Sequence, residues 1–172
     1  MKKKYSDWKI KKTNLLGVLK IELTSFEDHR GSYIETYNKN FFIHKGIKID
    51  FLQDDISVSQ KNVLRGIHGD QKTWKLISCL YGEFQLIVVN NDPQSNEYKK
   101  WESFILNFEN KMQILVPPKF GNGHLVLSDK CIFHYKQNTE YDRSGQFTIK
   151  WNDPSFTFKW KTQNPILSER DK

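Results

Sequence analysis

Residues 74–89 read Trp-Lys-Leu-Ile-Ser-Cys-Leu-Tyr-Gly-Glu-Phe-Gln-Leu-Ile-Val-Val, which predicts two β-strands joined by a tight turn. The apolar stretches at 74–80 and 83–89 have the length of strands rather than of helices. Tyr81-Gly82 lies between them, and glycine adopts the positive φ that a tight corner requires. Helical periodicity is nearly absent elsewhere, so the pattern indicates an all-β protein.

Short apolar stretches separated by turn residues continue along the chain. Further strands are expected at residues 15–23, 32–37, 51–59, 101–106, 112–116, 124–127, 132–136, 146–151 and 156–160. One or two helical turns are expected at 38–44, and turns at Asn90-Asn91-Asp92-Pro93 and Phe120-Gly121-Asn122-Gly123. About eleven strands fit a double-sheet jelly roll, whose centre can hold a small ligand. Without a repeat, linker or break in composition, residues 1–172 are predicted to form one domain.

Composition excludes several classes of protein. Twelve Phe, seven Tyr and five Trp are too many aromatic residues for a disordered chain, and no stretch is long or apolar enough to cross a bilayer. The net charge is +7, with a cluster of lysines at Lys2, Lys3, Lys4, Lys9, Lys11 and Lys12. Such a cluster suits nucleic acid, a membrane surface, a phosphorylated ligand or a solvated tail, and we favour the tail. Cys79 and Cys131 suggest no disulfide framework, so a cytoplasmic location is expected.

Strand parity predicts which polar side chains line the centre. His68 is expected to share a face with Leu64, while Arg65 points the other way unless a bulge intervenes. Lys75 is expected on the face of Ile77 and Cys79, and Tyr135 on the face of Phe133. A polar group among apolar neighbours costs stability unless it has partners or a task.

The residues alone leave a possible acid–base set. The five histidines include no His-x-His pair, and no CxxC is present, so a bound metal is not expected. GxGxxG, a P-loop and a G-x-S-x-G elbow are also missing. Taken singly, His68 and Tyr135 are more often structural than catalytic, and Asp171 is more often a solvated carboxylate. Composition and spacing therefore predict a β-domain with a polar-lined cavity.

The segment Gln53-Asp54-Asp55-Ile56-Ser57-Val58-Ser59-Gln60-Lys61-Asn62-Val63-Leu64-Arg65-Gly66-Ile67-His68 resembles the signature of dTDP-4-dehydrorhamnose 3,5-epimerases. Further matches follow in the same order from about residue 15 to the end, at residues 30–38, 74–77, 117–121, 133–136, 151–153 and 167–171. The sequence at residues 66–70, 74–80 and 117–124 resembles one branch of this family, the epimerases of GDP-linked 4-keto-heptoses in bacterial capsule synthesis. This resemblance implies a cupin jelly roll with a few short helices, forming a homodimer without metal or cofactor.

The resemblance also implies catalytic roles that agree with the chemistry of a 4-keto sugar. A proton beside a ketone is weakly acidic because its removal gives an enolate. His68 matches the family's base and Asp171 the carboxylate that orients it. Lys75 matches the residue that stabilises the oxyanion at O4, and Tyr135 the acid on the opposite face. A base and an acid on opposite faces can invert C3, C5 or both.

Binding residues are implied by the same resemblance. The positions that match family residues near the nucleotide, its diphosphate and the sugar are Arg30, Glu35, Gln53, Arg65, Asn122, Tyr141 and Arg170. Arginine suits phosphate because its planar fork pairs with two oxygens, and tyrosine offers a face to a base. The alternative for these residues is an ordinary surface ion pair.

Departures from the rhamnose enzymes shape the substrate prediction. Gly69-Asp70 replaces an aromatic-Gln pair, Leu86 replaces a strand carboxylate, Asn122 replaces the histidine of an Ala-His-Gly stretch, and Asp55 replaces an Asn. We therefore predict a GDP-4-keto-heptose as substrate. The alternatives are a dTDP-4-keto-6-deoxyglucose 3,5-epimerase, a non-catalytic cupin that binds a nucleotide sugar, and a metal-dependent cupin oxygenase. The missing His-x-His disfavours the last of these.

Overall fold

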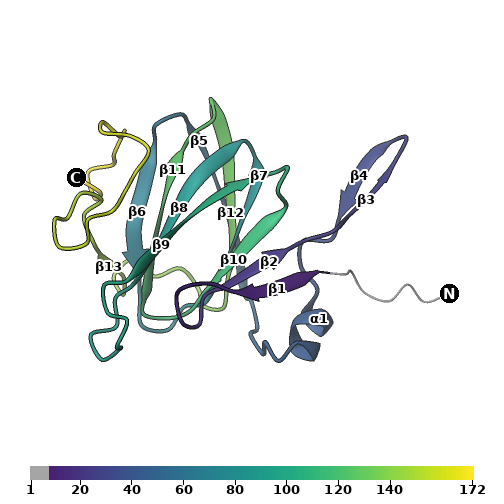
Figure 1. The fold of residues 1–172 in the computed structure, drawn as a ribbon, viewed down its shortest axis with the longest axis horizontal. Helices are drawn as coiled ribbons and strands as arrows, with labels where there is room; N and C mark the ends of the chain where they lie inside the picture. The colour runs from purple at the N-terminus through teal and green to yellow at the C-terminus, as the bar shows by residue number, and fades with distance from the viewer. Residues whose placement is uncertain (1–7) are drawn as a thin grey trace.

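Two facing β-sheets form the body of the protein (Figure 1). The computed structural model describes residues 8–172, so Lys2, Lys3 and Lys4 of the basic cluster lie outside the described residues. The six-stranded sheet has the order β1 (Lys9–Lys12), β2 (Leu19–Glu22), β10 (Met112–Val116), β7 (Lys75–Tyr81), β12 (Lys130–Gln137), β5 (Gln53–Gln60). The five-stranded sheet has the order β13 (Phe147–Thr148), β6 (Leu64–Gly69), β11 (Phe120–Val126), β8 (Glu83–Asn90), β9 (Trp101–Asn107). The predicted all-β, double-sheet fold is confirmed.

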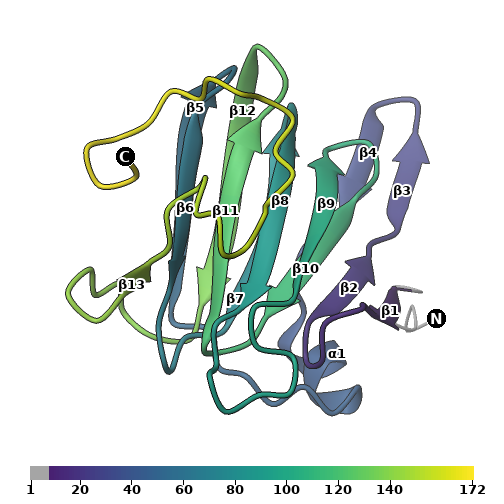
Figure 2. The same ribbon diagram turned by 60° about the vertical axis from the view of Figure 1, so that its left-hand side comes forward.

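A hairpin and one short helix complete the described part of the chain. The hairpin of β3 (Ser25–Asp28) and β4 (Gly31–Ile34) projects from the barrel (Figures 1 and 2). The helix α1 (Lys39–His44) begins at Asn38, whose side chain accepts a hydrogen bond from the Phe41 N–H. Within these residues no helix is long and apolar enough to span a membrane.

The space between the sheets is filled by an apolar core. Ile77 and Cys79 of β7 and Phe133 of β12 meet Phe84 of β8 in this core, and Tyr135 packs against it. Alternation along β7 thus directs Lys75 inward as well, as parity predicts.

Both outer faces are covered in part. The outer face of the five-stranded sheet is covered by the C-terminal segment 149–167, which crosses it in Figure 2. On the six-stranded sheet, Phe41 and Phe42 of α1 pack with Trp8 on Leu76 and Leu115. The sheet face beyond α1 exposes the side chains of Ile56 and Val58.

The turn expected at 120–123 is wrong, because these residues form the start of β11. Their glycines serve close packing rather than a change of direction. A Cβ on Gly121 would lie 2.6 Å from Ile67 Cγ2, and one on Gly123 would lie 2.9 Å from Ile67 Cγ1. The glycines therefore let Ile67 sit against the backbone of β11.

The strand expected at 156–160 is also absent from the structure. Phe156 and Trp160 are buried, but they pack on the face of the sheet and not at its edge. Side chains satisfy the backbone instead: Gln85 Nε2 donates to the Lys159 carbonyl at 2.7 Å. The apolar pattern correctly indicates burial, but it does not distinguish a strand from an extended segment that covers a sheet.

Several expected boundaries shift. The strands expected at 15–23 and 146–151 shorten to β2 and β13, while β1 and β3 were not predicted because they are short and largely polar. The turn at Tyr81-Gly82 is confirmed, with Gly82 at φ 74°. Residues 112–116 form β10 as expected.

A β-bulge in β6 changes which side chains enter the barrel. His68 pairs with Asn122 while Arg65 pairs with His124, so two residues of β6, Gly66 and Ile67, oppose one residue of β11, Gly123. Arg65 and His68 therefore face the same side, and Leu64 packs outside under the C-terminal segment. The expectation that His68 shares a face with Leu64 is wrong for this reason.

Gly66→Ala is predicted to destabilise the fold by about 3 kcal/mol, because φ is 112° and an added Cβ would lie 2.6 Å from Gly123 Cα. The matched control is Gly46→Ala, at φ 82° with nothing within 4 Å of the added Cβ. That change should cost only about 1 kcal/mol. Urea unfolding of both variants measures the difference, and equal losses would contradict a packing role for Gly66.

Candidate active site

A cavity of about 510 Å³ opens between the two sheets. Its walls come from β5, β6, β7, β11 and β12, and its rim from the segment after β12 and from the C-terminal segment. The lining residues are Ser57, Arg65, His68, Lys75, Asn122, His124, Tyr135, Tyr141, Arg143, Gln146, Ser168, Glu169, Arg170 and Asp171. All four predicted catalytic residues therefore share one hollow.

His68 and Asp171 form a hydrogen-bonded pair. His68 Nε2 lies 2.7 Å from Asp171 Oδ1 across 103 residues of sequence. Ser168 Oγ donates to the other carboxylate oxygen at 2.8 Å, and the whole Asp171 residue is only 3% exposed. The carboxylate is thus fixed by two contacts. It favours the tautomer of His68 with its proton on Nε2, which leaves Nδ1 with a lone pair.

The pKa of the Asp171 carboxyl reflects opposing effects. Burial raises it, but the hydrogen bonds from His68 and Ser168 and the attraction of His68 favour the carboxylate more strongly. The net shift is downward from the ordinary value. Asp171 is therefore ionised at neutral pH and can stabilise an imidazolium at His68.

Lys75 is a buried cation on the six-stranded sheet. Its residue is 9% exposed, and Nζ donates to Oδ1 of Asn122 on the facing sheet at 3.3 Å. Burial lowers the pKa of its ammonium, the Asp70 carboxylate opposes that shift, and the charge of Arg170 adds to it. A cation in such a water-poor place is well suited to stabilise an anion that develops near it.

Tyr135 lies on β12, in the sheet that faces β6 and His68. Burial raises the pKa of its phenol, and the neighbouring Asp55, its cross-strand partner, raises it further. The phenol therefore keeps its proton at neutral pH. The Lys75 Nζ lies 5.9 Å from the ring centroid. Base and acid candidates thus stand on facing walls of one cavity, with the cation beside the phenol.

Cationic side chains line the outer part of the cavity. Arg65 bonds Ser59 Oγ at 3.2 Å, and Arg170 bonds Gln146 Oε1 at 3.1 Å. Arg143 lies on the exposed segment after β12, near the half-exposed ring of Tyr141. Three guanidinium groups around one opening suit a diphosphate.

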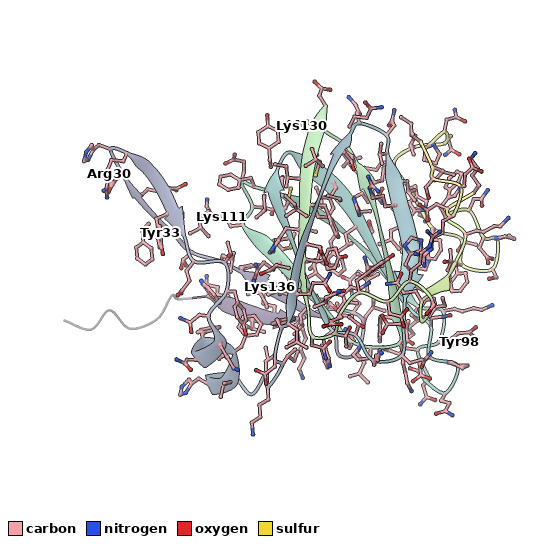
Figure 3. All side chains as sticks on the ribbon, turned by 180° about the vertical axis from the view of Figure 1, so that it is seen from behind. Arg30, Tyr33, Tyr98, Lys111, Lys130 and Lys136 are labelled. Carbon is pink, nitrogen blue, oxygen red and sulfur yellow. The ribbon has the colours of Figure 1, made fainter. Side chains whose placement is uncertain are left out.

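Three predicted binding residues do not reach this cavity. Arg30 stands on the projecting hairpin, far from the barrel in Figure 3, and forms an ion pair with Asp28. Glu35 accepts a hydrogen bond from Asn38 Nδ2 at 2.9 Å. Gln53 is not among the lining residues, and its Oε1 accepts from the Tyr141 N–H at 2.7 Å. The structure places Gln53 as a support for the Tyr141 segment.

Sequence reasoning missed six lining residues, namely Ser57, His124, Arg143, Gln146, Ser168 and Glu169. Strand parity could have found two of them. His124 lies two residues from Asn122 on β11, and Ser57 lies on the β5 face of Asp55. The other four lie outside regular strands, where no periodicity indicates direction.

Comparisons with known proteins show which family this chain belongs to. The sequence model of a family described as dTDP-4-dehydrorhamnose 3,5-epimerase matches residues 12–172. A dTDP-4-dehydrorhamnose 3,5-epimerase of Shigella flexneri is 38% identical over 164 residues, which cover 93% of this chain and 91% of that one.

Solved structures give the same result. The crystal structure of dTDP-4-dehydrorhamnose 3,5-epimerase from Elizabethkingia anophelis is 37% identical with a TM-score of 0.87, over 95% of this chain and 93% of that one. The Legionella pneumophila dTDP-6-deoxy-D-glucose-3,5-epimerase, in complex with dTDP-4-keto-L-rhamnose, is 33% identical with a TM-score of 0.91. It is matched over 95% of this chain and 89% of that one.

Asp171→Asn is predicted to make stability less sensitive to acid. A carboxyl whose pKa is lower in the folded state than in the unfolded state stabilises the fold at pH values above its unfolded pKa of 3.8. That stabilisation is lost as the pH falls through the folded pKa. The free energy of unfolding should therefore fall less steeply in the variant than in the wild type between about pH 5 and pH 2.

Urea unfolding at a series of pH values checks this expectation. The control is Asp129→Asn, an exposed position outside the cavity, which should keep the wild-type slope. Parallel curves for Asp171→Asn and the wild type would show that the His68 contact does not hold the carboxyl ionised.

Proposed function

Because the chain belongs to the dTDP-4-dehydrorhamnose 3,5-epimerase family, we propose that its cavity inverts a nucleotide-linked 4-keto sugar with His68 as base and Tyr135 as acid. The chain is thus an isomerase of the epimerase class. The observation that supports these roles is the placement of an imidazole and a phenol on facing sheets of one cavity.

The proposed reaction uses side chains in two steps. His68 Nδ1 takes the proton from the carbon beside the C4 ketone; the electron pair of that C–H bond forms a double bond to C4, and the π pair of the C4 carbonyl moves to O4. The Lys75 ammonium stabilises the resulting enolate, and Asp171 stabilises the imidazolium. Tyr135 then donates its proton to the opposite face of the same carbon, which inverts it. Exchange with water returns both side chains to their starting states.

The comparisons favour a dTDP-linked 4-keto-6-deoxyhexose over the GDP-linked heptose that the sequence predicts. The relatives described above are named as dTDP-sugar epimerases, and one is in complex with dTDP-4-keto-L-rhamnose. We therefore propose dTDP-4-keto-6-deoxyglucose as the reference substrate, inverted at C3 and C5. A GDP-4-keto-heptose of capsule synthesis is the second candidate. Two departures from the rhamnose enzymes favour it: Leu86 stands where those enzymes have a carboxylate, and Asn122 stands where they have a histidine.

We propose that the working form is a homodimer. The six-stranded sheet exposes Ile56, Val58 and Leu80, which are 61%, 52% and 37% exposed. The projecting hairpin also presents Tyr33, 70% exposed, away from its own barrel (Figure 3). Exposed apolar residues on one sheet face favour a partner. In such a pair the hairpin would extend over the second chain, and this is the arrangement in which Arg30 and Glu35 remain candidate binding residues.

The catalytic proposal predicts deuterium exchange in D₂O. The wild type should incorporate deuterium at C3 and C5 of dTDP-4-keto-6-deoxyglucose, and His68→Asn should slow this by at least about 100-fold. Tyr135→Phe should still lose the proton but should yield little inverted product. NMR follows both positions.

His44→Asn is the matched control, because His44 is exposed on α1 outside the cavity. It should exchange like the wild type. Undiminished exchange in His68→Asn would remove His68 as the base, and full inversion by Tyr135→Phe would remove Tyr135 as the acid.

The homodimer proposal predicts that Ile56→Asp yields a monomer in sedimentation equilibrium. A buried carboxylate without a partner at an apolar interface costs several kcal/mol, enough to shift dimerisation by a factor of about 100 or more. Ile43→Asp, the same substitution at an exposed isoleucine on α1, should leave the mass unchanged. A monomeric wild type, or a dimeric Ile56→Asp protein, would contradict the proposed interface.

A further inference from the structure

A second imidazole lies deep in the cavity, and the proposed reaction does not use it. His124 is on β11, two residues after Asn122 and on the same face. Its residue is only 3% exposed. The ring stacks on Phe133, with centroids 3.9 Å apart and planes 6° apart, and it meets the edge of Phe84 at 5.5 Å. His124 therefore forms a floor of the cavity, where the polar lining meets the apolar core.

This floor contains an unpaired polar atom. His124 Nε2 is buried and has no hydrogen-bond partner within the described residues. By contrast, Nε2 of His68 contacts Asp171 at 2.7 Å. A buried nitrogen without a partner costs about 1–3 kcal/mol. Such a cost at a cavity wall is consistent with a partner that arrives with the ligand.

The imidazole of His124 is neutral. Burial lowers its pKa to about 3; the positive charge of Arg65 also lowers it, as does His68 when it is an imidazolium, while the Asp171 carboxylate opposes them. A neutral imidazole has one N–H donor and one lone-pair acceptor. It therefore suits a hydroxyl, which can donate or accept, better than it suits a phosphate or a methyl group.

The depth of His124 indicates which part of the sugar it meets. The cationic and aromatic side chains of Arg143, Arg170 and Tyr141 stand at the outer part of the cavity, where they suit the nucleoside diphosphate. The diphosphate is attached at C1, and C4 lies across the ring from C1. The inner end of the sugar therefore presents the C3 hydroxyl and the substituent on C5.

We propose that His124 is a specificity-determining residue that hydrogen-bonds a hydroxyl at the inner end of the 4-keto sugar, either on C3 or on the C5 substituent. This inference rests on the proposed epimerase function and extends it to the choice of sugar. The group that His124 would bind is a hydroxyl at either position, and the experiment below distinguishes a hydroxyl on C3 from one on the C5 substituent.

The test compares three dTDP-linked 4-keto sugars that differ in one group. The first is dTDP-4-keto-6-deoxyglucose, with a C3 hydroxyl and a C5 methyl. The second is its 3-deoxy analogue, and the third has a hydroxyethyl group in place of the C5 methyl. Deuterium exchange at C5 gives kcat/KM for all three, and calorimetry gives the binding affinity.

The variants are His124→Phe, His124→Gln and His44→Phe. His124→Phe keeps the stacking on Phe133 and removes the polar atoms, whereas His124→Gln keeps a donor and an acceptor. His44→Phe is the same substitution on exposed α1. Thermal unfolding of each variant confirms that it is folded, and His124→Gln provides the comparison if His124→Phe is not.

The expected result is a selective loss. His124→Phe should lower kcat/KM and affinity about tenfold for sugars that contain the recognised hydroxyl, and should leave the sugar without it unchanged. Loss with the first and third sugars but not the 3-deoxy analogue assigns the C3 hydroxyl. Loss confined to the third sugar assigns the C5 substituent. His124→Gln should restore most of the selectivity.

Two outcomes separate this inference from the proposed function. Equal effects of His124→Phe on all three sugars, or no effect on any, would overturn the role of His124 while leaving the epimerase intact. Selective binding through His124 without exchange in the wild type would support the role of His124 and overturn the epimerase.

Discussion

The chemistry of the cavity depends on the register between β6 and β11. Because two residues of β6 oppose one of β11 at the bulge, a guanidinium and an imidazole three positions apart both face inward. In a regular strand one of them would point into the apolar cluster under the C-terminal segment. Gly66 makes this register possible, because the backbones of β6 and β11 approach too closely there for a side chain. Close contact between the two backbones therefore determines which side chains of β6 enter the cavity.

Within that frame, each ionisable group is tuned by a different neighbour. Two histidines share the cavity, but one is held against a carboxylate and the other is stacked on the ring of Phe133. Burial opposes charge on Lys75 and on the Tyr135 phenol alike, so the cation is brought closer to losing its proton while the phenol retains its own. Groups of one residue type thus acquire separate roles from their surroundings.

The sequence predicts local features of this arrangement well. Strand β10 follows from a short apolar stretch and the inward direction of Lys75 follows from alternation, and both signals depend only on near neighbours. The direction of His68 does not follow, because the bulge arises from contact between Gly66 and Gly123, which are distant in sequence. Only the resemblance to a family predicts Asp171 as the partner of the catalytic base His68, because a single carboxylate near the end of a chain belongs to no periodic sequence pattern. The strand expected at 156–160 failed for a related reason, since the extended segment covers the sheet instead of joining it.

The C-terminal segment links catalysis to a part of the fold outside both sheets. It crosses the five-stranded sheet through Phe156 and Trp160 and then supplies Asp171 to His68. Its backbone is held largely by side chains and by turns rather than by ladder hydrogen bonds. Such segments open at lower free energy than the strands beneath them. The protein can therefore lose the carboxylate partner of its base by undocking this segment while the barrel remains folded, so that heat or denaturant would extinguish turnover before spectroscopic signals of β-structure begin to change.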